Sequence, residues 1–152
     1  MTLNDFEEQK KKILHELVVS EDETLDNLKK LVSKSKHFFF IEGATGRVVL
    51  SRDFDFSNTE KIMFLLMGKY FASNLEIIPR KPLDIRQISE ELGGIPITTL
   101  SAPLGKLVSD NLVNKPEKGK YGIAYHAIET FLDDMWKKYK PKVDAENETW
   151  GL

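Results

Sequence analysis

The sequence predicts an α+β protein that is mostly helical. Apolar residues recur at the helical spacing of three and four positions in several segments. Short runs rich in β-branched and aromatic residues flank glycine-containing turns and indicate two β-hairpins. Between two of the helical segments stands Gly93-Gly94-Ile95-Pro96, a breaker short enough to join two adjacent helices. With 152 residues, 41% of them hydrophobic, and no cysteine, the chain is expected to bury one core without disulfides.

Residues 1–36 are predicted to form a helical N-terminal extension. Leu3, Phe6 and Ile13 fall near one helical face, and a second helix is expected after a capping box made by Ser20 and Glu23. The extension carries seven basic and eight acidic residues, so it presents a mixed charged surface. We therefore expect these helices to pack or self-associate, and not to bind phosphate.

Residues 37–56 are predicted to form a β-hairpin. Two β-rich runs, 38–41 and 47–50, flank Gly43-Ala44-Thr45-Gly46. A phosphate-binding loop would need Gly-Lys-Ser/Thr at its end and a helix directly after it. The chain has neither, so these glycines are interpreted as a turn.

The helix expected from residue 57 is the predicted centre of the core. Ser57 and Glu60 form a second capping box at its start. Residues 62–71 are apolar almost all round, which indicates burial on several sides. A connector with two prolines and the basic pair Arg80-Lys81 follows.

A helix–turn–helix is predicted next. Asp84 can cap a helix that ends at Gly93-Gly94, and a further helix is expected from Ile97 to Asp110. Two short strands, 112–115 and 120–124, then flank a turn at 116–119. Helix, short turn and helix is the arrangement whose second helix can enter a DNA major groove.

The segment from Asp84 to Ala124 resembles the winged helix-turn-helix superfamily and is similar to small archaeal regulator-like proteins with a helical extension. The matching pieces are Ile88-Ser89-Glu90-Glu91-Leu92-Gly93, Thr98-Thr99-Leu100-Ser101-Ala102-Pro103-Leu104, Lys106-Leu107-Val108-Ser109-Asp110-Asn111-Leu112-Val113 and Lys118-Gly119-Lys120-Tyr121. The resemblance covers residues 57–126. It implies a winged-helix domain, extended by a C-terminal helix to residue 138. The chain departs from many DNA readers in placing Pro103 inside the recognition helix and in having Lys106 as its single basic residue.

A DNA-binding, transcription-regulator-like function is the resulting hypothesis, with helix 97–110 in the major groove and the wing lysines on phosphates. The candidate contacts with double-stranded DNA are Thr98, Thr99, Ser101, Lys106, Lys115, Lys118 and Lys120. From residue 97 to 126 the chain has four lysines against two acids, a mild positive excess in a chain of net charge -2. The alternative is a winged-helix adaptor that binds another protein and no DNA. Capping and solvation are an equal explanation for the three hydroxyls.

The last predicted helix, 125–138, carries an apolar stripe that can pack on the core or on a second copy. We expect a homodimer formed through the N- and C-terminal helices, and a mobile tail over residues 139–152. A second copy would double the phosphate contacts.

No enzymatic activity, cofactor or metal site is predicted. His15, His37 and His126 stand in three different elements without metal-binding spacing, and no nucleophile or nucleotide motif occurs. No apolar run approaches the length of a membrane span, and the N-terminus lacks the pattern of an export signal. A cytoplasmic location is therefore expected.

Overall fold

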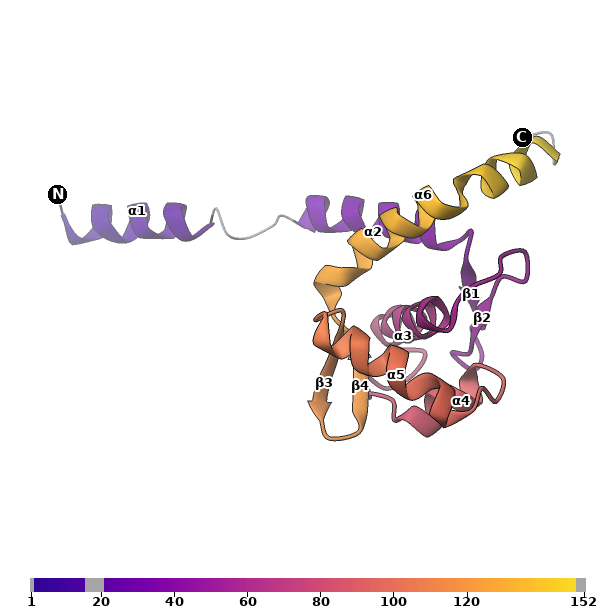
Figure 1. Cartoon of the computed structure of the whole chain (residues 1–152). Helices are drawn as coiled ribbons and strands as arrows, with labels where there is room; N and C mark the ends of the chain where they lie inside the picture. Colours follow the sequence, from indigo (N-terminus) through magenta and orange to yellow (C-terminus); the bar gives the residue numbers. More distant parts are fainter. Residues whose placement is uncertain (1, 16–20, 150–152) are drawn as a thin grey trace. The chain divides into compact units, whose positions relative to one another are not determined.

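Six helices and two antiparallel hairpins make up the described part of the chain, residues 2–15 and 21–149, in a computed structural model (Figure 1). This confirms an α+β fold that is mostly helical. Side-chain surroundings are described for residues 2–14 and 26–139. The chain divides into two compact units, Met1–Val32 and Ser33–Leu152. The boundary falls inside a helix, four residues before the predicted end of the extension.

The first unit holds α1 (Leu3–His15) and most of α2 (Glu21–Ser35). Thr2 and Asp5 cap the start of α1 reciprocally: the Thr2 hydroxyl accepts from the Asp5 amide at 3.2 Å, and the Asp5 carboxylate accepts from the Thr2 amide at 3.3 Å. The capping box predicted at Ser20 lies outside the described residues.

The centre of the second unit is α3 (Asn58–Asn74), which contacts both hairpins and the two helices that follow it (Figure 1). It begins at the predicted capping box: the Ser57 hydroxyl accepts from the Glu60 amide at 3.2 Å, and the Glu60 carboxylate accepts from the Ser57 amide at 2.9 Å. Residues 62–68 are all buried. An apolar surface around the whole circumference requires neighbours on every side, and α3 has them.

The first hairpin pairs β1 (Phe39–Ile41) with β2 (Val48–Leu50), in a register that sets Phe39 opposite Leu50. Its turn ends at Gly46, which has a φ of 75°. A Cβ there would stand 2.3 Å from Cγ2 of Ile78, so both the backbone and the packing require glycine.

An aromatic cluster joins this hairpin to α3 and to the last helix. Phe38 and Phe64 are fully buried, with ring centroids 5.2 Å apart. Phe56 lies 4.8 Å from Phe64, and Phe131 approaches Phe64 from the last helix at 5.0 Å. Such ring pairs add to the stabilisation from area burial.

The last helix, α6 (Tyr125–Thr149), is longer than predicted. We expected it to end at residue 138 and a mobile tail to follow, because residues 141–152 are rich in acidic residues and contain one aromatic residue. The structure instead continues the helix through most of that region. Just past the predicted end, the Tyr139 hydroxyl donates to Oε1 of Glu60 at 2.7 Å and its ring lies 5.1 Å from that of Phe54, so α6 is still packed on the core at this position. Residues 150–152 of the predicted tail lie outside the described residues.

Replacing Gly68 by alanine is expected to lower the free energy of unfolding by about 1–2 kcal/mol, although alanine normally stabilises a helix interior. A Cβ at Gly68 would lie 2.5 and 2.7 Å from the two γ-methyl groups of Val48. Val48 is β-branched and stiff at χ1, so α3 and β2 would have to separate. Urea unfolding measures the change.

The matched control is the double variant G68A/V48A, which removes the clashing methyl groups. It should show a favourable coupling energy of at least about 0.5 kcal/mol between the two changes. Strict additivity would contradict the close packing of β2 on α3.

Candidate nucleic-acid interface

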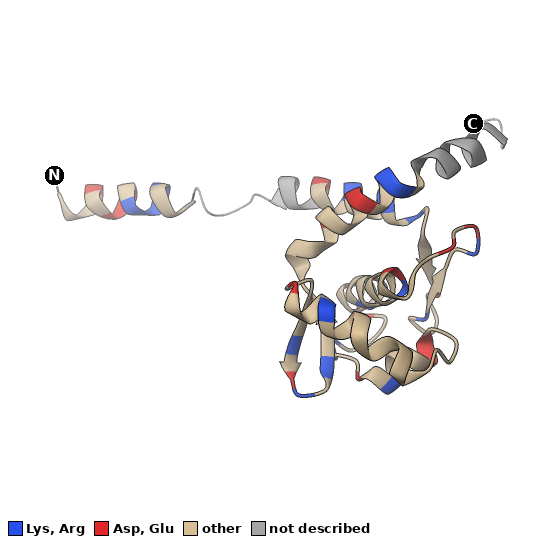
Figure 2. Cartoon of the chain, in the orientation of Figure 1, with Lys and Arg blue, Asp and Glu red and all other residues tan. Residues whose placement is uncertain are grey.

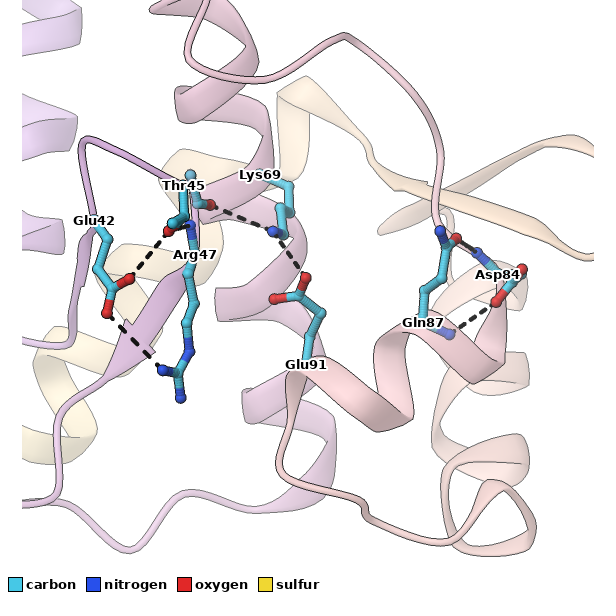
Figure 3. Close-up of polar contacts among 8 residues, drawn as sticks. Glu42, Thr45, Arg47, Lys69, Asp84, Gln87 and Glu91 are labelled. Carbon is cyan, nitrogen blue, oxygen red and sulfur yellow. Dashed lines mark hydrogen bonds and ion pairs between the residues drawn. The ribbon is translucent and has the colours of Figure 1, made fainter.

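The predicted helix–turn–helix is formed by α4 (Ile85–Glu91) and α5 (Ile97–Ser109). Asp84 starts α4 as predicted: its carboxylate accepts from the Gln87 amide at 2.8 Å, and the Gln87 side chain accepts from the Asp84 amide at 3.0 Å (Figure 3). Gly93 and Gly94 end α4 with φ values of 86° and 87°, a region that glycine enters without strain. The breaker residues therefore make the predicted turn.

A partly buried lysine links α4 to α3. The Lys69 ammonium donates to a carboxylate oxygen of Glu91 at 3.1 Å and to the Gly46 carbonyl at 3.3 Å (Figure 3). Its side chain is 14% exposed, so this ion pair is better shielded than a surface pair. One side chain thus links α3, the first hairpin and the end of α4.

The inner face of α5 is apolar and its outer face is small and polar. Leu100, Leu104 and Leu107 are buried against the core. The exposed positions of α5 are Ile97, Thr98, Thr99, Ser101, Ala102, Gly105, Lys106 and Ser109. Among the helices that the structure describes, α5 alone contains no aspartate or glutamate, and its single charge is Lys106 (Figure 2).

The hydroxyls predicted as contacts differ in their surroundings. Thr98 and Thr99 are exposed in the first turn, where Pro96 is the N-cap and no side chain caps the helix. Capping is therefore not their role in this structure. The Ser101 hydroxyl donates to the Ile97 carbonyl at 2.9 Å, so its proton is used within the helix while its oxygen can still accept.

The second hairpin pairs β3 (Val113–Glu117) with β4 (Lys120–Ile123) and carries the three other lysines (Figure 2). Lys115 lies 5.9 Å from the centroid of the Tyr121 ring. Lys118 is exposed in the turn, before Gly119 with its φ of 77°. The ammonium of Lys120 lies 3.7 Å from the Asp84 carboxylate, so its charge is partly compensated.

A third short β-contact joins the connector to this hairpin, and the sequence did not predict it. Leu83 and Tyr121 exchange two backbone hydrogen bonds of 2.9 and 2.7 Å as an isolated antiparallel bridge. The bridge brings the connector, with its exposed pair Arg80-Lys81, close to the hairpin. The available signal was the extended conformation that Pro82 and the capping Asp84 impose on both sides of Leu83.

The two helical faces predicted for dimerisation differ in their exposure to solvent. The stripe of α6 is buried inside the second unit, where Ala127, Ile128, Leu132 and Met135 are at most 7% exposed. Intramolecular packing therefore accounts for α6. In the first unit, Leu3, Phe6, Ile13 and Leu14 remain 52–77% exposed on α1.

The part of the chain that the structure describes was also searched for a metal site and for a membrane-spanning helix. No group of three or more His, Asp or Glu side chains there is placed to share a metal ion. No helix among the described residues combines the length and apolar character of a membrane span. Comparison of the chain with protein-family models, with curated proteins and with solved structures finds no match.

Proposed function

We propose that residues 57–126 form a winged helix-turn-helix domain that binds double-stranded DNA, with α5 in the major groove and the β3–β4 hairpin as the wing. The observation that carries the proposal is the outer face of α5. It is exposed, lacks acidic residues in a chain with 24 of them and carries Lys106, and the hairpin that follows carries the exposed Lys115 and Lys118. A polyanion is repelled least at such a face.

The order of the elements supports the same proposal. A central helix, a short strand contact at Leu83, two helices and a hairpin follow each other as in winged-helix domains. Ala102 and Gly105 leave little side-chain bulk on α5, which lets a helix backbone approach a groove closely. The uncapped first turn adds amide donors and a partial positive charge for a phosphate.

Within this proposal the lysines contribute unequally. Lys106, Lys115 and Lys118 are exposed and have no ion-pair partner among the described residues. Lys120 would have to leave Asp84 in order to bind a phosphate, so its contribution is smaller. The proposal also includes a homodimer, now through the N-terminal helices α1 and α2, because the stripe of α6 is buried. A regulatory role and a cytoplasmic location stay predictions.

The variant K106Q/K115Q/K118Q tests the proposal. Each lysine that contacts a phosphate releases about 0.9 of a counterion from the DNA when the protein binds. Loss of three such contacts should therefore weaken duplex binding roughly 100-fold at about 0.1 M salt. The slope of log K against log salt should fall by about three. Fluorescence anisotropy with a random-sequence duplex, titrated at several salt concentrations, measures both quantities.

The matched control is K36Q/K61Q/K137Q, which makes the same change of charge in the second unit, outside α5 and the hairpin. It should keep most of the affinity and most of the slope. If both triple variants lost the same affinity for DNA, binding would depend only on the net charge of the protein and not on these three lysines. No duplex binding by the native chain would reject the DNA proposal and leave the adaptor alternative.

A further inference from the structure

A groove of about 460 Å³ lies between α3, the connector that follows it and the β3–β4 hairpin, and we call it the α3–hairpin groove. One wall is a single face of α3, since Leu66, Lys69, Tyr70 and Ser73 stand at i, i+3, i+4 and i+7. Tyr121, on β4 of the hairpin, also lines the groove. Sites for small molecules have volumes of about 300–1,000 Å³, so the groove is large enough for one.

The groove is built from stiff parts. Pro79, Pro82 and Pro116 line it, and the ring of each fixes φ. The two hydrogen bonds between Leu83 and Tyr121 hold the connector against the hairpin. The walls of the groove would therefore lose little conformational entropy when a ligand binds, which favours binding.

The charges along the groove have one sign. Lys69, Arg80 and Lys81 line it, and no aspartate or glutamate does. Lys69 is committed to Glu91 and to the Gly46 carbonyl. The other two cations are exposed at the connector.

Arg80 can still bind an anion. One of its terminal nitrogens donates to the Asn74 side chain at 2.8 Å. A guanidinium has five N–H donors in a planar fork that fits a carboxylate in two-point contact. Lys81 supplies a second positive charge beside it.

We propose that the α3–hairpin groove binds a small aromatic carboxylate, with its ring between the walls that contain Tyr70 and Tyr121 and its carboxylate on Arg80 and Lys81. The apolar and aromatic walls select a ring-bearing anion over a bare oxyanion, which would leave those walls against water. This inference goes beyond DNA binding and does not depend on it, because the site lies on the connector side of the hairpin and is tested without DNA.

The experiment titrates the full-length ¹⁵N-labelled chain with 2-naphthoate and follows amide shifts by NMR. We expect a dissociation constant of roughly 0.1–1 mM, with shifts concentrated at the connector, the end of α3 and β4. The neutral analogue 2-naphthamide should bind at least about tenfold more weakly, because it lacks the charge that Arg80 and Lys81 neutralise. Inorganic phosphate should give no saturable shifts at the groove.

Two variants separate the charge from the ring. R80Q/K81Q changes two exposed side chains and should weaken 2-naphthoate at least about tenfold while leaving 2-naphthamide unchanged. R86Q/K137Q makes the same exchange outside the groove and should keep the native affinity. Gly122 lines the groove at a position where a Cβ would meet no atom within 4 Å, so G122L should weaken both naphthalene compounds.

Equal affinities for 2-naphthoate and 2-naphthamide would overturn the proposal, and so would equal affinities for 2-naphthoate and phosphate. Shifts confined to other parts of the chain would also overturn it. None of these outcomes bears on the lysine test for DNA, so the two proposals can fail separately.

Discussion

Replacement of Phe64 by alanine should lower the free energy of unfolding of the second unit by about 3–5 kcal/mol. The ring is completely buried, with the rings of Phe56, Phe131 and Phe38 at 4.8, 5.0 and 5.2 Å. Its removal would leave a cavity where α3, the first hairpin and α6 meet. The loss therefore combines the transfer energy of the ring with the contacts that its neighbours lose.

Urea unfolding followed by far-ultraviolet circular dichroism measures this change, and F40A is the matched control. Phe40 is 61% exposed, so the same substitution there should change stability by less than about 0.5 kcal/mol. F64L keeps most of the apolar volume and should cost about 1.5 kcal/mol or less. If F64A cost no more than F40A, the aromatic cluster would not be the centre of the core.

The second large effect is expected at Glu60, where E60A should lower the free energy of unfolding by about 2–4 kcal/mol at pH 7. The Glu60 side chain is only 7% exposed. Its carboxylate accepts from the Lys138 ammonium at 2.7 Å, from the Tyr139 hydroxyl at 2.7 Å and from the Ser57 amide at 2.9 Å. Alanine would remove the contact of α6 with the start of α3 together with half of the capping box.

The pH dependence of this effect follows from the pKa of Glu60. Burial alone would raise that pKa, but the hydrogen bonds from Lys138, Ser57 and Tyr139 outweigh burial and hold the pKa below its ordinary value of 4.5. The carboxylate therefore stabilises the fold fully above the unfolded value, and this contribution is lost as the pH falls through the lower folded value. The difference between the native chain and E60A should shrink as the pH is lowered from 7 towards 3.

E60Q separates the charge from the hydrogen bonds at this position. Glutamine can still accept from the Ser57 amide, as in other capping boxes, but it cannot form an ion pair with Lys138. We expect E60Q to lose less stability than E60A and to lack most of the acid dependence. A constant difference between the native chain and E60A from pH 7 to pH 3 would mean that Glu60 acts only as a cap.

Local patterns in the sequence were sufficient to predict most of the second unit. The capping box at Ser57, the cap at Asp84 and the Gly93-Gly94 turn need only neighbours a few residues away, and each was confirmed. The buried leucines of α5 are spaced by three and four positions, a pattern that likewise depends only on helical periodicity. These features define where α3 and α4 begin, where α4 ends and which face of α5 is buried.

The remaining features depend on residues that are distant in the sequence. The helix α6 extends past its predicted end, and Tyr139, the first residue beyond that end, is held by Glu60, a residue on another helix. The pairing of Lys120 with Asp84 and the strand contact of Leu83 arise because the connector folds back on β4. For the candidate site, the lysines could therefore be predicted from the sequence, but the pairing of Lys120 with Asp84 could not.

The bridge between Leu83 and Tyr121 also bears on how the protein opens. It closes a loop that contains α4, α5 and β3, so the helix–turn–helix is tied to the rest of the unit at both of its ends. Opening that loop must break both backbone bonds, and the chain entropy released depends only weakly on its length. Amide protons at these two positions would consequently exchange with solvent in a common, cooperative event, and α5 would be presented to a partner as part of one rigid element.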